Sequence, residues 1–321
     1  MSFGYRSRST TMWCVSDRYG KPIAAPSLIN TVLESRAAME LGAFLAAAPL
    51  LRLLGRGDRH PVLVLPGFTA TDRSTEPLRW LLRGQGYMTH GWGLGRNLGP
   101  TDRIVDGIHD RLTVLHERHG RKITVIGWSL GGIYARELGR DLPEMVRQVV
   151  TLGSPFRMDT HDKTPVSRLF DSLNPVVRED VLHIASTEDD RPPLTMPSTA
   201  IYTRTDGIVR WHTCIDAVRE QHENIEVLAS HSGLGWNPSS VFAILDRLQQ
   251  PEGDWRPFHA PLPLRSFYPR PATWTPAAAA GATPKAKAAQ AKDTAAQAKS
   301  PQAPAPMASA KRNRNGLHSV A

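Results

Sequence analysis

A serine flanked by glycines stands where a strongly apolar stretch of the chain ends. Residues 123–132 read ITVIGWSLGG, so Ser129 lies two positions from Gly127 and two from Gly131. An apolar strand followed by a helical pattern predicts a sharp turn that exposes the hydroxyl, and the glycines avoid collisions with neighbouring elements. A hydroxyl held in this way is typical of a nucleophile, and the dipole of the following helix favours developing negative charge.

A serine nucleophile needs a base, usually a histidine that a carboxylate orients. Of the twelve histidines, His231 directly follows a strand-like run, in SHSG. Asp206 follows another such run, in TRTDG, and Asp216, on the next expected helix, is the weaker competitor. The alternative interpretation of His231 is a histidine that caps a turn. The chain order Ser129, Asp206, His231 predicts a Ser-Asp-His triad.

Acyl transfer also needs two backbone N–H groups that stabilise a tetrahedral oxyanion. Leu130, the residue after the serine, is expected to supply one of them. Phe68 is expected to supply the other, because it follows the flexible Gly67 in VLVLPGF. The alternative for this dipeptide is an ordinary Pro-Gly turn. The predicted site contains no metal and no cofactor.

Strand-like and helix-like stretches alternate along the chain, as the positioning of these residues requires. The expected strands are 61–67, 86–92, 123–128, 147–155, 199–207 and 224–233. The expected helices between them are 77–84, 104–119, 132–139, 214–220 and 240–248. Apolar strands that alternate with helices predict an α/β fold with a doubly wound, mostly parallel sheet. Ligands bind beyond the carboxyl ends of such strands, where the candidate residues are expected.

Four regions are expected along the 321 residues. They are an N-terminal extension (1–59), an α/β domain (60–250), a segment rich in proline and aromatic residues (251–274) and an Ala/Lys/Pro tail (275–321). Because the tail has almost no large apolar side chains, we expect it to be disordered.

Two further segments lie outside the strand-helix alternation. Residues 28–54 have a helical pattern, with Leu28, Val32, Leu41, Leu45 and Leu53 as the apolar positions. This helix is expected to pack on the α/β body, and contact with a membrane surface is the alternative. The long connection 156–197 is expected to form a small helical cap over the strand ends, with a buried structural insertion as the alternative.

Charge and cysteine content limit the class of protein. The tail carries seven basic residues and one acidic residue, so it contributes +6 of the net charge of +9 and leaves the body near balance. A specific nucleic-acid partner is therefore not expected. The two cysteines, Cys14 and Cys214, have no metal-ligand spacing and favour a reducing compartment.

Targeting features are weak. The first twenty residues lack the apolar core of a secretory signal, and the apolar stretch 41–51 is too short to span a bilayer. We therefore expect a cytoplasmic protein. Peripheral membrane contact through the N-terminal helix or the basic tail remains open.

From about Pro61 to Leu248 the chain resembles the α/β-hydrolase superfamily, and is most similar to its bacterial lipases and esterases. The resemblance is carried, in order, by VLVLPGF, GWSLGG, VTLGSP, YTRTDGIV and SHSGL. It implies hydrolysis of a small acyl ester or a lipid through an acyl-enzyme, without metal or organic cofactor. Many members have His-Gly where this chain has Pro66-Gly67, and the Pro-Gly version resembles the branch of lecithin:cholesterol-acyltransferase-like enzymes.

Two other functions are compatible with the same residues. An acyltransferase or a thioesterase would use the same triad with a different acceptor or substrate. A catalytically silent protein of this fold would bind a lipid or a partner instead. The presence of all three triad residues favours an enzyme.

Overall fold

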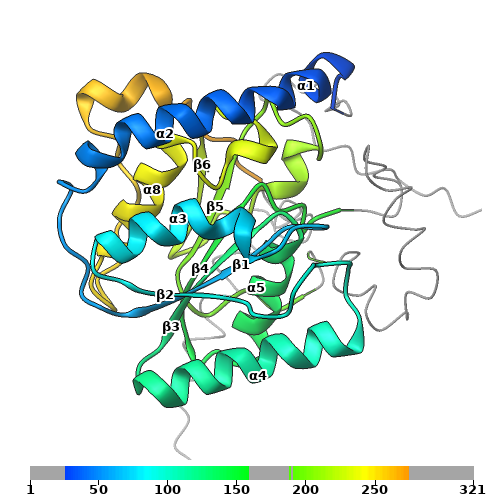
Figure 1. Ribbon diagram of the computed structural model, residues 1–321, viewed down its shortest axis with the longest axis vertical. Coiled ribbons are helices and arrows are strands. Elements are labelled where there is room, and N and C mark those ends of the chain that lie inside the picture. The colour runs from blue at the N-terminus through cyan, green and yellow to red at the C-terminus, as the bar shows by residue number, and fades with distance from the viewer. Residues whose placement is uncertain (1–25, 159–187, 189–190, 275–321) are drawn as a thin grey trace, which may run out of the picture. The chain divides into compact units, whose positions relative to one another are not determined.

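The structure is a computed structural model that describes residues 26–158, 188 and 191–274 (Figure 1). The first 25 residues, the tail from 275 onward and most of the expected cap lie outside these ranges. In the described part, six strands form one sheet in the order β2-β1-β3-β4-β5-β6. The strands are β1 (Pro61–Leu65), β2 (Met88–Gly91), β3 (Ile123–Trp128), β4 (Val146–Leu152), β5 (Ser198–Tyr202) and β6 (His222–Glu226).

Every neighbouring pair of strands in this sheet is parallel, which confirms the predicted fold class. The chain order reverses between β1 and β3, because β2 pairs with one side of β1 and β3 with the other. Ligands bind at such a switch point, beyond the carboxyl ends of the strands. The turn at Ser129 and the loop at Gly67 follow β3 and β1 there.

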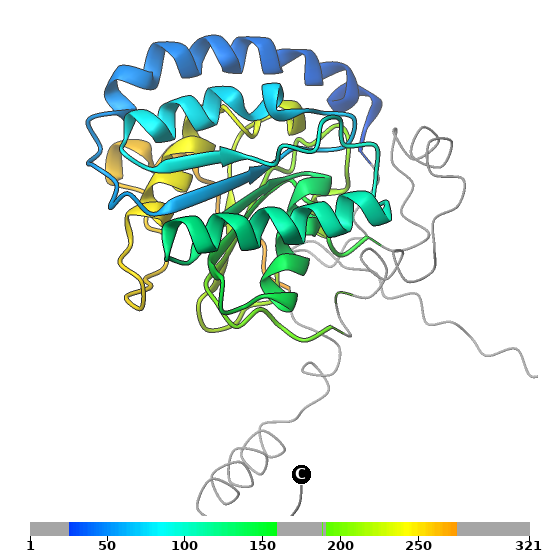
Figure 2. The same ribbon diagram turned by 60° about the horizontal axis from the view of Figure 1, so that its bottom comes forward.

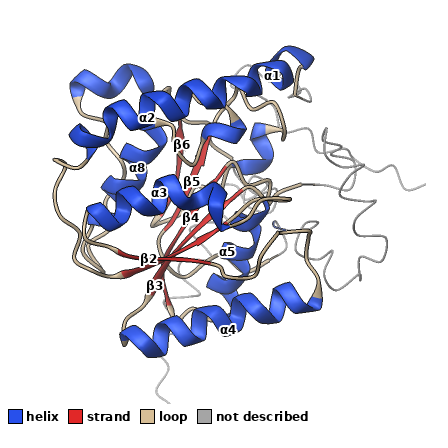
Figure 3. Ribbon diagram, in the orientation of Figure 1, coloured by secondary structure: helices blue, strands red, loops and turns tan. Residues whose placement is uncertain are grey.

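Helices cover both faces of the sheet (Figure 3). The helices are α1 (Leu28–Val32), α2 (Ala37–Leu51), α3 (Asp72–Gly84), α4 (Asp102–His119), α5 (Leu130–Asp141) and α8 (Pro238–Gln249). Short 3-10 helices within the described residues are η1 (Leu33–Arg36), η3 (Trp211–Cys214), η4 (His231–Gly233) and η5 (Leu262–Phe267).

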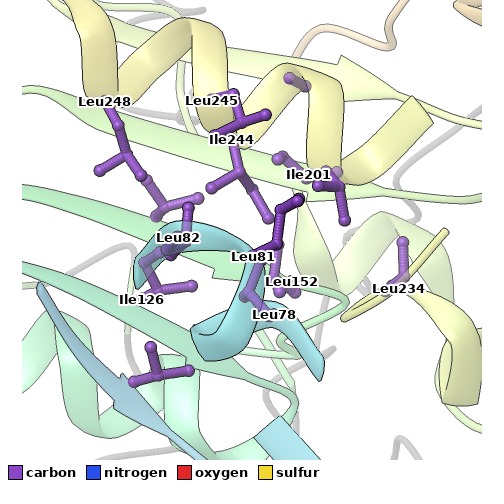
Figure 4. Packing of buried hydrophobic residues seen from close by; sticks show 14 of the residues in the cluster. Leu78, Leu81, Leu82, Ile126, Leu152, Ile201, Leu234, Ile244, Leu245 and Leu248 are labelled. Carbon is purple, nitrogen blue, oxygen red and sulfur yellow. The ribbon is translucent and has the colours of Figure 1, made fainter. Parts of the chain in front are cut away.

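The two faces carry separate cores because side chains alternate along each strand. On β1, Val62 and Val64 join the core beneath α2, α3 and α8, whereas Leu63 and Leu65 join the core beneath α4 and α5. Figure 4 shows the first core, in which leucines of α3 and α8 meet over β3, β4 and β5. Figure 2 shows α4 on the other side of the sheet.

The N-terminal helical segment packs on the α/β body, as expected, and of the expected stripe Leu41 packs against the core. Phe44, Ala48 and Leu51 are buried against the core that α8 contributes to. Leu28 and Leu53, by contrast, are 86% and 80% exposed. The segment therefore combines a buried side with exposed apolar residues, and membrane contact stays a prediction.

One expected helix is wrong, and several element boundaries differ from the sequence prediction. The helix expected over 214–220 is wrong: η3 ends at Cys214, and Ile215 is extended with φ −102° and ψ 140°. Contacts with residues farther along the chain explain the difference, because the Asn224 side chain accepts the N–H of Asp216 at 2.7 Å and Ala217 forms a β-bridge with Trp274. Helix α3 begins at Asp72 rather than at 77, and β6 ends at Glu226 rather than at 233.

The segment 251–274 packs on the domain. The rings of Phe258 and Tyr268 lie 4.8 Å apart and both contact Phe242 of α8. No helix within 26–158 or 191–274 combines the length and the apolar character needed to cross a bilayer.

Candidate active site

Ser129 occupies the sharp turn between β3 and α5. Its backbone has φ 52° and ψ −121°, a conformation that a residue with a Cβ atom rarely adopts. The Ser129 N–H donates to the carbonyl of Leu152 at 2.8 Å, which ties the turn to the end of β4. The serine is thus held in a strained position at the carboxyl edge of the sheet.

Three glycines let the elements around this turn approach closely. A Cβ atom on Gly127 would lie 2.2 Å from the carbonyl oxygen of Gly131, and one on Gly131 would lie 2.4 Å from that of Leu65. A Cβ atom on Gly132 would overlap the hydroxyl of Ser154. These contacts are with backbone or a buried side chain, so a larger residue would displace the turn.

Asp206 and His231 are brought together at the same edge. His231 Nδ1 lies 2.7 Å from Asp206 Oδ2, and both side chains are buried. The other carboxylate oxygen of Asp206 accepts the N–H groups of Ile208 and Val209, each at 2.8 Å. The carboxylate is therefore fixed in the orientation that directs the Nε2 atom of His231 away from it.

The electrostatic environment favours the protonated form of His231. Burial by itself would lower the pKa of the imidazole, but the carboxylate of Asp206 and, to a smaller extent, that of Glu34 raise it above its ordinary value. Carboxylates that stabilise the imidazolium suit a general base, because the base carries a proton during the reaction.

Ser129 and His231 converge on the end of β4. Ser129 bonds to Leu152, and a Cβ atom on the adjacent Gly153 would lie 3.1 Å from His231 Nδ1. From the side of β1, a Cβ atom on Gly67 would lie 3.2 Å from that of Ser129. The loop that precedes Phe68 therefore borders the serine.

The two expected oxyanion donors lie on the elements that sequence reasoning assigned to them. Leu130 is the first residue of α5, so its N–H has no acceptor within the helix. Phe68 lies in a turn that the Ala70 N–H closes on the carbonyl of Gly67 at 3.2 Å. Leu130 directly follows Ser129, and Phe68 directly follows Gly67, which borders Ser129.

Asn97, which sequence reasoning missed, shapes the loop of Phe68. The side-chain amide of Asn97 donates to the carbonyl of Pro66 at 2.9 Å. The backbone carbonyl of Asn97 accepts the N–H of Thr69 at 2.6 Å. Tyr134 of α5 donates its hydroxyl to the Asn97 side chain at 3.3 Å. No local pattern in the sequence marks this asparagine.

Asp216 lies elsewhere and is not a partner of His231. Its carboxylate bonds to Arg136 at 2.7 Å and lies 3.3 Å from His222. The Ser198 hydroxyl also bonds to Asp216. Because Ser198 begins β5 and His222 begins β6, Asp216 lies at the amino ends of the strands. Burial opposes ionisation of Asp216, but Arg136 and His222 outweigh it and hold its pKa far below the usual range.

Within the described ranges, no group of three or more His, Cys, Asp or Glu side chains is arranged as a metal site.

No protein-family model matches the chain. Solved structures resemble it at low sequence identity. Lipase B from Aspergillus fumigatus is 16% identical with a TM-score of 0.49, and the match covers 62% of this chain and 55% of that lipase.

Two smaller proteins match over most of their own length. A metagenome-derived lipolytic enzyme is 18% identical with a TM-score of 0.46, over 60% of this chain and 93% of that one. A lipase-esterase related protein from Clostridium acetobutylicum is 18% identical with a TM-score of 0.42, over 61% and 98%. The parallel six-stranded sheet, its switch point between β1 and β3, and the strained serine turn after β3 give this chain the α/β-hydrolase fold.

Proposed function

We propose that this protein is a serine hydrolase that cleaves carboxylic esters through an acyl-enzyme. Ser129 is the nucleophile, His231 the general base and Asp206 the carboxylate that orients the base. The observation that carries the proposal is the 2.7 Å contact between His231 Nδ1 and Asp206 Oδ2, at the sheet edge that also holds the strained Ser129.

In this mechanism the Ser129 hydroxyl attacks the ester carbonyl carbon while His231 Nε2 accepts its proton. The N–H groups of Leu130 and Phe68 stabilise the oxyanion. The intermediate collapses, the alcohol leaves with the proton from His231, and the acyl group stays on Ser129. A water molecule, deprotonated by His231, then attacks the acyl-enzyme, and His231 returns the proton to Ser129 Oγ as the bond to the acyl carbon breaks and the acid leaves.

The apolar packing beside the serine turn supports an apolar acyl group. Leu130 is half-buried and packs with Ile133, Phe156 and Ala200, so apolar side chains continue from the turn toward β5. Apolar packing of this kind keeps water away from the turn where the oxyanion would develop. An acyl ester or a lipid, the substrate proposed from the sequence, suits these apolar surroundings.

Transfer of the acyl group to an alcohol is the second candidate. The loop reads Pro66-Gly67, as in the acyltransferase-like branch that the sequence resembles, and an alcohol could replace water in the second half of the reaction. A thioester substrate would use the same residues.

The test combines covalent labelling with turnover. A fluorophosphonate probe should label the wild-type protein and not Ser129→Ala, and a series of p-nitrophenyl esters of increasing acyl length should be hydrolysed. Added alcohol acceptors separate hydrolysis from acyl transfer by the product formed. Labelling that survives Ser129→Ala would disprove the assignment of the nucleophile.

A further inference from the structure

The N-terminal segment, outside the α/β core, reaches both loops of the proposed triad. This segment lies next to α3 and α8 in two views (Figure 1, Figure 2). One oxygen of the Glu34 carboxylate accepts the N–H of Gly207 at 2.9 Å and the N–H of His231 at 3.0 Å. The other oxygen accepts the N–H of Ser232 at 2.8 Å. A single carboxylate therefore bridges the loop of Asp206 and the loop of His231.

Two more charged residues of this segment bond to the same loops. Arg36 donates to the hydroxyl of Thr205 at 2.7 Å and to the carbonyl of Ala229 at 2.6 Å. Glu40 accepts the N–H of Ser230 at 2.8 Å and pairs with Arg36 at 3.4 Å. Side chains of η1 and α2 thus hold the loop of Asp206 at Thr205 and Gly207, and the loop of His231 at residues 229–232.

The glycines that follow the acid and the base make room for these contacts. A Cβ atom on Gly207 would lie 2.3 Å from the carbonyl of Asn30, and one on Gly233 would lie 1.6 Å from the Glu40 carboxylate. Thr31 also donates its hydroxyl to the carbonyl of Gly207 at 2.9 Å. Close approach of the N-terminal segment is therefore built into both loops.

We propose that Glu34, Arg36 and Glu40 form a clamp that fixes Asp206 and His231 relative to each other, with Glu34 as its central positioning residue. The catalytic consequence of the clamp rests on the proposed function. His231 and Ser232 begin the short 3-10 helix η4, whose first N–H groups have no acceptor within it, so the Glu34 carboxylate supplies that acceptor.

Glu34 also contributes charge. Burial by itself would raise the pKa of its carboxyl, but the N–H groups of Ser232, His231 and Gly207 outweigh burial and lower it. The carboxylate is therefore ionised at neutral pH. The charged groups around the imidazole are Asp206, and Glu34, Arg36 and Glu40 of the N-terminal segment.

The decisive variant is Glu34→Gln, with Glu223→Gln as the matched control. Glu223 is another half-buried carboxylate that accepts a backbone N–H, from Phe258 at 2.7 Å, but it lies at the start of β6, away from the site. Glu34→Gln should lower kcat about 10- to 100-fold and leave KM within about twofold, because the base is displaced rather than the substrate pocket. The rising limb of the pH profile should move to lower pH.

Glu34→Asp separates reach from charge. It keeps the negative charge but shortens the side chain, so kcat should stay low while the pH profile resembles that of the wild type. Glu223→Gln should change neither quantity. Equal effects of Glu34→Gln and Glu223→Gln, or no effect of either, would overturn the clamp.

Hydrogen exchange keeps the clamp and the proposed function distinguishable. Amide exchange at residues 205–209 and 229–234 should accelerate in Glu34→Gln and not in Glu223→Gln, whatever the activity. If the wild type hydrolyses no ester while exchange accelerates as expected, the proposed function fails and the clamp stands. Unchanged exchange in Glu34→Gln would overturn the clamp even in an active enzyme.

Discussion

The indole N–H of Trp128 donates to the backbone carbonyl of His231 at 3.1 Å. The residue that precedes the candidate nucleophile therefore also holds the loop of the candidate base. The indole is buried, packs edge-on against Trp236 at 5.1 Å, and leaves no room for a Cβ atom on Gly235. Trp128, the bulky residue between Gly127 and Ser129, thus links the serine turn to the loop of His231 through one hydrogen bond.

Trp128→Phe should keep most of this packing and lose the bond. A neutral hydrogen bond contributes about 1 kcal/mol. Loss of this bond should loosen the loop of His231 and lower kcat about fivefold. Steady-state kinetics on a p-nitrophenyl ester measures the effect.

Trp236→Phe is the control, because it removes a comparable bond, from the Trp236 indole to the carbonyl of Ala37 at 3.0 Å. It should lower stability with little change in kcat. A larger loss of kcat in Trp236→Phe than in Trp128→Phe would contradict the coupling.

The two aspartates should give opposite phenotypes. Asp206→Asn should lower kcat by about three to four orders of magnitude and leave the protein folded, since the imidazole loses its orienting charge. Asp216→Asn should reduce stability by roughly 3 kcal/mol, because Arg136 is buried and loses a charged partner. Denaturant unfolding and turnover, measured on both variants, separate the effects. An inactive but stable Asp216→Asn, beside an active Asp206→Asn, would reverse the assignment.

Local patterns in the sequence predicted the sheet and the serine turn because the causes of both are local. The strand 123–128 is a continuous apolar run, and the collisions that Gly127 and Gly131 avoid arise within a few residues or with the adjacent strand. The helix expected over 214–220 failed because contacts distant along the chain, with Asn224 and Trp274, decide its conformation.

The residues that sequence reasoning missed act over long distances in the chain. Glu34 bonds to His231, 197 positions away, and no periodicity links the two. In α2 the alanine-rich sequence presents apolar residues on every side, so Leu45 was expected on the buried face although Phe44 occupies it. Tertiary packing, not local pattern, selects the face.

Gly127→Ala should abolish labelling by the fluorophosphonate. The added methyl would lie 2.2 Å from a backbone oxygen of Gly131, so the turn must move and the hydroxyl moves with it. Gly42→Ala is the control, because a Cβ atom there meets nothing within 4 Å in the middle of α2. That variant should be labelled normally and be more stable by about 0.5–1 kcal/mol. Normal labelling of Gly127→Ala would contradict the steric argument.

The strain at Ser129 should appear as a reversed preference between alanine and glycine. In a helix or strand interior, glycine is less stable than alanine by about 0.5–1 kcal/mol. At φ 52° and ψ −121° the Cβ atom of alanine keeps the strain, of about 1–3 kcal/mol, whereas glycine releases it. Ser129→Gly should therefore unfold at a higher denaturant concentration than Ser129→Ala. Both variants should be inactive, and the reverse order of stability would show that the turn is unstrained.

The ionisation of His231 gives a prediction whose sign is fixed by its neighbours. Burial would lower its pKa, but Asp206 and Glu34 raise it, so the imidazole should titrate above the ordinary value of about 6.5. The folded state then binds this proton more tightly than the unfolded state. Protonated His231 therefore contributes to the free energy of unfolding at acid pH, and this contribution is lost as the pH rises through the pKa of His231 in the folded state.

Proton NMR of the imidazole in Ser129→Ala should show this titration directly, and kcat/KM of the wild type should rise with the same midpoint, because only neutral His231 accepts the serine proton. Asp206→Asn should move the midpoint to lower pH. His90 provides an internal control in the same spectra: burial and the nearby His119 lower its pKa to about 4, so it should titrate far below His231. A His231 midpoint below that of an exposed histidine, with the Asp206 carboxylate intact, would mean that the carboxylate does not stabilise the imidazolium, and the proposed role of Asp206 would fail with it.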